Sequence, residues 1–159
     1  MEQQPSAIEQ ALMIKEDAMG PQDPESVYRR LVDEVISGGN VAPVDDLASP
    51  DFVEHEALPP GIPKNREGVK QFFSLLHTAF PDTMATIENL VVQGDMVAAR
   101  LVVTGMHRGD FMGIPPTGKQ ISVQVFDLVR VIDGKITEHW GLSDQFSLLQ
   151  QLGAIPAPG

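Results

Sequence analysis

The stretch from Met96 to Asp144 limits the possible folds more than any other part of this sequence. It contains three long runs rich in valine and isoleucine, and branched side chains favour a pleated, half-buried strand. Asp133-Gly134 joins the last two runs, and this dipeptide tolerates the positive φ of a tight hairpin turn. The runs predict strands over residues 96–107, 119–132 and 135–142. We therefore expect an antiparallel sheet at the centre of the protein.

The chain before this sheet carries helical patterns. Asp23-Pro24 predicts a helix from Pro24 to Ser37, because aspartate caps a helix N-terminus and proline fits its first position. Asn65 caps a second predicted helix, over residues 66–79. Shorter elements are expected as a helical turn at 43–48, an extended piece at 52–55, a strand at 83–93 and a closing helix that ends at Gly153. Helices first and antiparallel strands afterwards predict an α+β fold with the helices on one face of the sheet.

The length of 159 residues suits one domain with one core. We expect that domain to span residues 21–153 and to be followed by a flexible tail over 154–159. Residues 1–20 form an N-terminal arm with a weak helical pattern around 6–18, and Gly20-Pro21 separates it from the domain. The arm is either frayed or packed on a partner subunit.

The composition excludes several classes of protein. The 22 acidic and 11 basic residues give a formal net charge of −11, which argues against nucleic acid or an anionic membrane surface as a partner. The chain has no cysteine, so disulfides and thiolate chemistry are excluded. No apolar run reaches the roughly eighteen residues of a membrane span. The N-terminus also lacks a signal-peptide pattern, so a cytoplasmic protein is expected.

Strict alternation along the last strand places Ile136, Glu138, Trp140 and Leu142 on one face, and the apolar members mark it as the inner face. Asp144 would then lie at the inner end of the sheet beside the indole, where a carboxyl group loses hydration and can serve as a general base. A second reading places Asp144 harmlessly in the first turn of the closing helix, where negative charge is favoured. Sequence pattern alone does not separate the two.

Two histidines are candidates for a cavity mouth. His107 lies where the first long strand enters a proline-containing loop, and His55 ends the extended piece; each could equally be a hydrogen-bonded boundary residue. His139 falls on the face opposite Trp140 and is expected to face solvent. Neighbouring side chains of the extended Glu54-His55-Glu56 point alternately, so we expect no metal site there.

The loop over residues 108–118 carries Phe111, Met112 and Ile114 beside Pro115-Pro116. These side chains form either an apolar lip of a cavity or a plug of the sheet's end. The sequence contains no phosphate loop, dinucleotide fingerprint or nucleophile elbow, so no cofactor is expected.

Three strings of residues resemble a known family. Residues 111–119 (FMGIPPTGK), 126–130 (FDLVR) and 133–140 (DGKITEHW), together with Asp144, look like the SnoaL-like polyketide cyclase family. The resemblance covers roughly residues 24–153. It implies the fold of nuclear transport factor two, a cone-shaped α+β barrel in which a bent antiparallel sheet packs on N-terminal helices around an apolar pocket.

The resemblance also implies an activity. In such cyclases an aspartate matching Asp144 acts as general acid/base in an intramolecular aldol ring closure, without metal or cofactor, and His107 and His55 would support it. The substrate would be a small, mostly apolar carbonyl compound, and by analogy the protein would be a homodimer. The expected pocket walls are Trp140, Phe126, Phe52, Phe72 and Met112. Two other classes remain open: a non-catalytic small-molecule binding protein and a dimerisation module.

Overall fold

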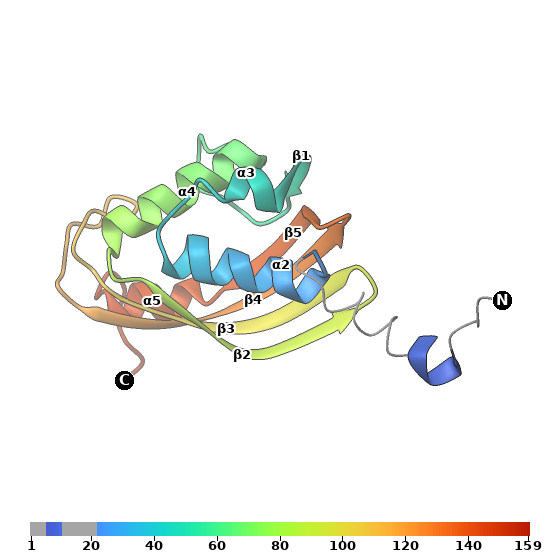
Figure 1. Ribbon diagram of the computed structural model, residues 1–159. Coiled ribbons are helices and arrows are strands. Elements are labelled where there is room, and N and C mark those ends of the chain that lie inside the picture. Colours follow the sequence, from blue (N-terminus) through green and yellow to red (C-terminus); the bar gives the residue numbers. More distant parts are fainter. Residues whose placement is uncertain (1–5, 11–21) are drawn as a thin grey trace.

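A computed structural model describes residues 6–10 and 22–159 of the chain (Figure 1). Residues 7–10 form a turn of helix. The rest of the helix expected around residues 6–18 lies outside the described residues.

The helices begin where the sequence supplies a cap. The Asp23 carboxylate accepts a hydrogen bond of 3.1 Å from the Ser26 backbone N–H, and the Asn65 side chain accepts one of 3.0 Å from the Gly68 N–H. The predicted helix over 24–37 is confirmed, although its second half has π-helical hydrogen bonding. The helices are α2 (Pro24–Arg30), η1 (Leu31–Ser37), α3 (Val44–Leu47), α4 (Arg66–Ala79) and α5 (Gln145–Gln151).

One five-stranded sheet has the strand order β1-β5-β4-β3-β2. Its strands are β1 (Ala48–Glu54), β2 (Met84–Gln93), β3 (Met96–Met106), β4 (Gln120–Ile132) and β5 (Lys135–Ser143). The antiparallel prediction is confirmed for β2 to β5, whereas the extended piece at 52–55 belongs largely to β1, which pairs parallel with β5. Edge strands β1 and β2 do not pair with each other in the described part of the chain, so the sheet curves without closing into a barrel.

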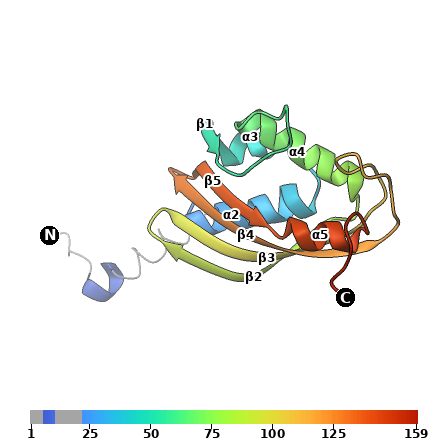
Figure 2. The same cartoon turned by 180° about the vertical axis from the view of Figure 1, so that it is seen from behind.

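The helices lie on the concave face of the sheet, as the predicted α+β architecture requires (Figures 1 and 2). Odd-numbered residues of β3 and β4 point toward them, and Val97, Leu101 and Val129 pack in one apolar core with Val35 and Leu47. Burying a side chain of this size stabilises the fold by about 1.5–3 kcal/mol. Helix α4 does not press fully against the sheet, and the space between them holds the cavity described below.

A β-bulge divides strand β5 into two halves. Arg130 of β4 pairs with Glu138, but the next residue, Val131, pairs with Ile136, so Thr137 is an extra residue in β5. Outward and inward side chains alternate again from Glu138 onward, so Ile136 and His139 both point inward. The prediction that Glu138, Trp140 and Leu142 share the inner face with Ile136 is wrong, and so is the prediction that His139 faces solvent.

Helices long and apolar enough to cross a membrane do not occur in residues 6–10 and 22–159.

Candidate active site

A cavity of about 490 Å³ lies between helix α4 and the concave face of the sheet. Most of its wall is apolar, with side chains from the strands, from α4 and α5, and from the loop between β3 and β4; these include Phe52, Phe72, Phe73, Leu101, Met112 and Leu148. Four ionisable side chains, Glu54, Glu56, Asp127 and His139, also line it. A mostly apolar wall with a few converging polar groups is the usual composition of a small-molecule site.

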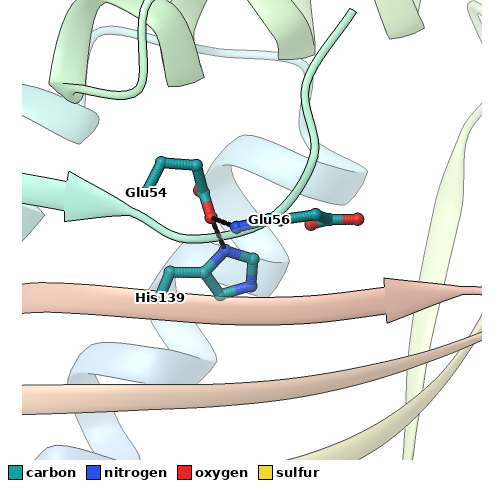
Figure 3. Close-up of side chains that lie close together, drawn as sticks. All are labelled: Glu54, Glu56 and His139. Carbon is teal, nitrogen blue, oxygen red and sulfur yellow. Dashed lines mark hydrogen bonds and ion pairs between the residues drawn. The ribbon is translucent and has the colours of Figure 1, made fainter.

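A continuous chain of hydrogen bonds connects the buried ionisable groups. The Tyr28 hydroxyl donates to Asp127 Oδ2 over 2.7 Å, and His139 Nε2 donates to Asp127 Oδ1 over 3.0 Å. On the other side of the ring, His139 Nδ1 lies 2.8 and 2.9 Å from the two carboxylate oxygens of Glu54. Glu54 in turn accepts a 2.9 Å hydrogen bond from the backbone N–H of Glu56 (Figure 3). Each buried carboxylate therefore has donors, as buried charge requires.

Local structure explains why these residues meet. Asp127 replaces an apolar residue in the inward-facing series Val125, Asp127, Val129 of β4. The bulge in β5 turns His139 to the same face, and the parallel register of β1 sets Glu54 directly opposite His139. Tyr28 reaches Asp127 from the buried face of α2.

His139 is held as a cation between two carboxylates. Burial by itself would lower the pKa of the imidazole, but the hydrogen bonds to Asp127 and Glu54 outweigh burial and raise the pKa to about 10. Burial, reinforced by the charge of Asp127, raises the pKa of Tyr28, so the phenol remains a neutral donor. Near neutral pH, His139 is thus the positively charged member of the network and Tyr28 a neutral one.

Glu56 differs from the other two carboxylates. Its carboxylate accepts no hydrogen bond from the residues that the structure describes, and the side chain extends away from the Glu54–His139 pair (Figure 3). Burial raises the pKa of Glu56 to about 7; the charge of His139 opposes this rise, and the charges of Asp127 and Glu54 add to it. A carboxyl group that titrates near neutral pH in an apolar cavity can both accept and return a proton.

Glu54, Glu56 and His139 also have donor atoms within 4.8 Å of one another, a spacing that a metal ion could bridge. However, His139 Nδ1 lies at hydrogen-bond distance from both oxygens of Glu54, so a proton on this nitrogen already joins the two groups. We therefore describe the cluster as a hydrogen-bonded ion pair with a neighbouring free carboxyl group.

Asp144 lies outside the cavity. It is exposed and caps helix α5, where its Oδ1 accepts a 3.0 Å hydrogen bond from the Ser147 backbone N–H. Of the two readings of Asp144, the one with loss of hydration at the inner end of the sheet is wrong, because the bulge reverses the faces that strict alternation gives to the residues after Thr137. The location at the start of the closing helix is the one observed.

The structure does not bring His107 or His55 to the cavity wall. His107 is buried against Phe80, and its Nδ1 accepts a 3.2 Å hydrogen bond from the Thr117 backbone N–H, which anchors the loop between β3 and β4. His55 stacks on Trp140 with ring centroids 4.6 Å apart, and its Nε2 lies 2.9 Å from Glu138 Oε2. Both histidines therefore make local contacts outside the cavity wall.

The five expected wall residues divide into two groups. Phe52, Phe72 and Met112 line the cavity, and their contact with a substrate stays a prediction. Phe126, with 56% of its surface exposed, and Trp140 lie on the outer face of the sheet.

Sequence reasoning missed five site residues, Tyr28, Glu54, Glu56, Asp127 and His139. Asp127 could have been recognised from the sequence, because it is a charged residue at an inward position between Val125 and Val129, in an otherwise apolar series.

The comparisons with known proteins agree with this architecture. The family model for the SnoaL-like polyketide cyclase matches residues 26–152. The aklanonic acid methyl ester cyclase DauD of Streptomyces sp. (strain C5) is 33% identical over 131 residues, covering 77% of this chain and 80% of the relative. The nogalonic acid methyl ester cyclase of Streptomyces nogalater is 32% identical over 117 residues, covering 72% of this chain and 87% of the relative.

Two solved structures have the same fold. IdmH from Streptomyces antibioticus is 37% identical with a TM-score of 0.71, and the match covers 82% of this chain and 98% of IdmH. TsrD from Streptomyces laurentii is 26% identical with a TM-score of 0.74, covering 82% of this chain and 95% of TsrD. The family match spans most of the chain, including every strand and the cavity that they line. This chain therefore belongs to the SnoaL-like polyketide cyclase family.

Proposed function

We propose that the protein is a cofactor-independent cyclase that closes a ring in a small, mostly apolar carbonyl compound, with Glu56 as the general acid/base. The observation that carries this proposal is a carboxyl group with a pKa of about 7 in the wall of an apolar cavity. Membership of the family and the names of the cyclase relatives support ring closure as the reaction class. The role expected for Asp144 passes to Glu56, because Glu56 is at the cavity and Asp144 is not.

The reaction would be an intramolecular aldol addition. Ionised Glu56 removes a proton from the carbon next to one carbonyl group, and the resulting enolate carbon bonds to a second carbonyl carbon of the same molecule. The new alkoxide takes up one proton, and Glu56 can return the one it removed. The product is an isomer of the substrate, so the step needs no oxidant, reductant or second substrate.

The other groups of the site would act through charge and position. A ring nitrogen of the His139 imidazolium lies within 4.8 Å of a Glu56 carboxylate oxygen, and its positive charge would stabilise the negative charge that develops on the enolate. Tyr28 and Asp127 fix the orientation of the imidazole ring. The apolar walls, Phe52 and Phe72 among them, would fold the flexible substrate and exclude water.

The test uses the methyl esters of aklanonic and nogalonic acid, the compounds named for the two cyclase relatives. Turnover is followed by liquid chromatography and mass spectrometry, which would detect a new species of unchanged mass. Glu56→Gln should reduce turnover by about 10²–10⁴-fold, the usual contribution of a general base.

Glu67→Gln is the matched control, because Glu67 is an exposed glutamate on α4 that pairs with Lys70 and lies away from the cavity. Equal turnover in wild type and Glu56→Gln would overturn the assignment of the base. Saturable binding of both esters, without turnover in any of the three proteins, would instead favour the small-molecule binding protein.

The homodimer expected from the resemblance also belongs to this proposal. Phe126 and Leu128 of β4 pair with Leu142 and Trp140 of β5, so four large apolar side chains form one block on the outer face. Leu142 has 78% of its surface exposed, which a second copy of the chain would cover. Leu142→Asp should halve the mass measured by light scattering, and an unchanged mass would remove this face as the dimer interface.

A further inference from the structure

Gly141 of β5 is the point where the backbone comes closest to the Glu56 carboxyl group. Gly141 pairs with Asp127 of β4 and belongs to the inner face of the sheet. A Cβ atom added at Gly141 would collide with Glu56 Oε2 and would lie 3.0 Å from Glu56 Cδ. It would also lie 2.8 Å from His139 Cε1. Real Cβ atoms almost never have contacts this short, so both side chains would have to move, Glu56 by the larger amount.

The backbone conformation gives no other reason for a glycine at this position. Gly141 lies in a regular part of β5, beyond the bulge, and it is absent from the residues with positive φ. Glycine in the interior of a strand weakens the sheet unless another group needs the space. Here the group in that space is a carboxylate that comes from a different segment, the extended chain after β1.

His139 cannot readily move aside, because both of its ring nitrogens hydrogen-bond to buried carboxylates. The Glu56 carboxylate has no such partner among the described residues, so it is the group that would yield. The backbone of Glu56 would remain fixed by its hydrogen bond to Glu54. A side chain at position 141 would therefore displace mainly the carboxylate, and the His139 ring, held at both nitrogens, would shift only slightly.

We propose that Gly141 is a positioning residue: its missing side chain creates the space in which the Glu56 carboxylate is held against the cavity wall. The functional part of this inference rests on the proposed role of Glu56 as acid/base. The steric part does not, and it can be tested without substrate. Positions 56 and 141 then form one unit, in which the size of one side chain limits the size of the other.

The first measurement is urea unfolding of Gly141→Ala in three backgrounds: wild type, Glu56→Gln and Glu56→Ala. Glutamine keeps the volume of glutamate without its charge, whereas alanine removes the volume. The added methyl group should lower the unfolding midpoint most in the wild-type and Glu56→Gln backgrounds and least with Glu56→Ala, where only the contact with His139 remains. An equal effect in all three backgrounds would overturn the proposal.

The second measurement follows the Glu56 carboxyl carbon by NMR titration in Gly141→Ala. A displaced carboxylate becomes hydrated, so its titration midpoint should fall from about 7 toward 4.5. Turnover should fall by about 10²–10⁴-fold together with this shift, as for loss of the base itself. An unchanged midpoint and unchanged turnover would overturn the positioning role.

The two proposals fail in different ways. If Glu56→Gln retains full turnover while the unfolding data show the expected dependence on background, the base is wrongly assigned and the steric role of Gly141 stands. If Glu56→Gln is inactive but Gly141→Ala destabilises all backgrounds equally, the base stands and the role of Gly141 is refuted.

Discussion

Glu56→Gln should make the protein more stable at alkaline pH, although it removes the proposed catalytic base. Burial raises the pKa of Glu56 from its ordinary value of 4.5 to about 7, so the folded protein holds this proton more tightly than the unfolded chain does. Between these two values the unfolded chain has lost the proton and the folded protein has kept it. The free energy of unfolding therefore falls as the pH rises through this range. One pKa unit corresponds to about 1.4 kcal/mol, so the ionised group destabilises the fold by about 3 kcal/mol above pH 7, as an upper bound.

Glutamine cannot ionise, so the variant escapes this loss. Urea unfolding of wild type, Glu56→Gln and the control Glu67→Gln would be measured from about pH 4 to about pH 8.5. The stability of Glu56→Gln relative to wild type should increase by about 3 kcal/mol across this range, most steeply between the two pKa values. Any contribution of His139 to the pH dependence of the free energy of unfolding is present in all three proteins and cancels in the difference between them. A difference that does not change with pH would mean that Glu56 titrates like an exposed glutamate, and the reasoning behind the proposed base would be refuted.

The remaining predictions concern catalysis and the polar network. The ratio kcat/KM should rise with pH through about 7, because only ionised Glu56 accepts a proton, and it should be about 100-fold lower two pH units below that midpoint; a flat profile would contradict the assignment. Asp127→Ala leaves the Tyr28 hydroxyl and one nitrogen of His139 without an acceptor, so urea unfolding should show a loss of about 3–5 kcal/mol. A loss below about 1 kcal/mol would mean that the buried ion pair contributes little. Asp144→Ala should cost about 1 kcal/mol through loss of the α5 cap and leave turnover at the wild-type level; inactivation would return the acid/base role to Asp144. Dialysis against a chelator should change neither turnover nor Tm, since a proton joins Glu54 and His139; activity lost on dialysis and restored by a divalent ion would show that the cluster binds metal.

Much of the fold could be predicted because its signals are local. The N-caps Asp23 and Asn65 lie beside the helices that they begin, and each makes the expected hydrogen bond. Asp133 and Gly134 have φ values of 49° and 73°, as the tight turn between β4 and β5 requires. Each of these features is decided by residues a few positions apart in the sequence, so a single sequence is enough to find it.

The site could not be predicted in the same way, because it depends on register. Glu54 and His139 are 85 positions apart, and they meet only through the parallel pairing of β1 with β5. Whether His139 faces the cavity can be predicted only if Thr137 is identified as the bulged residue of β5, and no pattern of hydrophobicity marks it. Strict alternation therefore placed Trp140 in the cavity and His139 in solvent, the reverse of the observed arrangement.

The bulge lets β5 hold Thr137 as one extra residue without changing which later residues face the cavity. Thr137 is the extra residue, so its deletion would remove the bulge and leave Ile136 paired with Val131, Glu138 with Arg130 and His139 with Val129. The imidazole would then stay in the cavity and the indole would stay on the outer face. In a family with this strand, members that differ by one residue at this point can keep the same inner residues, and alignments that place the gap elsewhere would compare inner residues with outer ones.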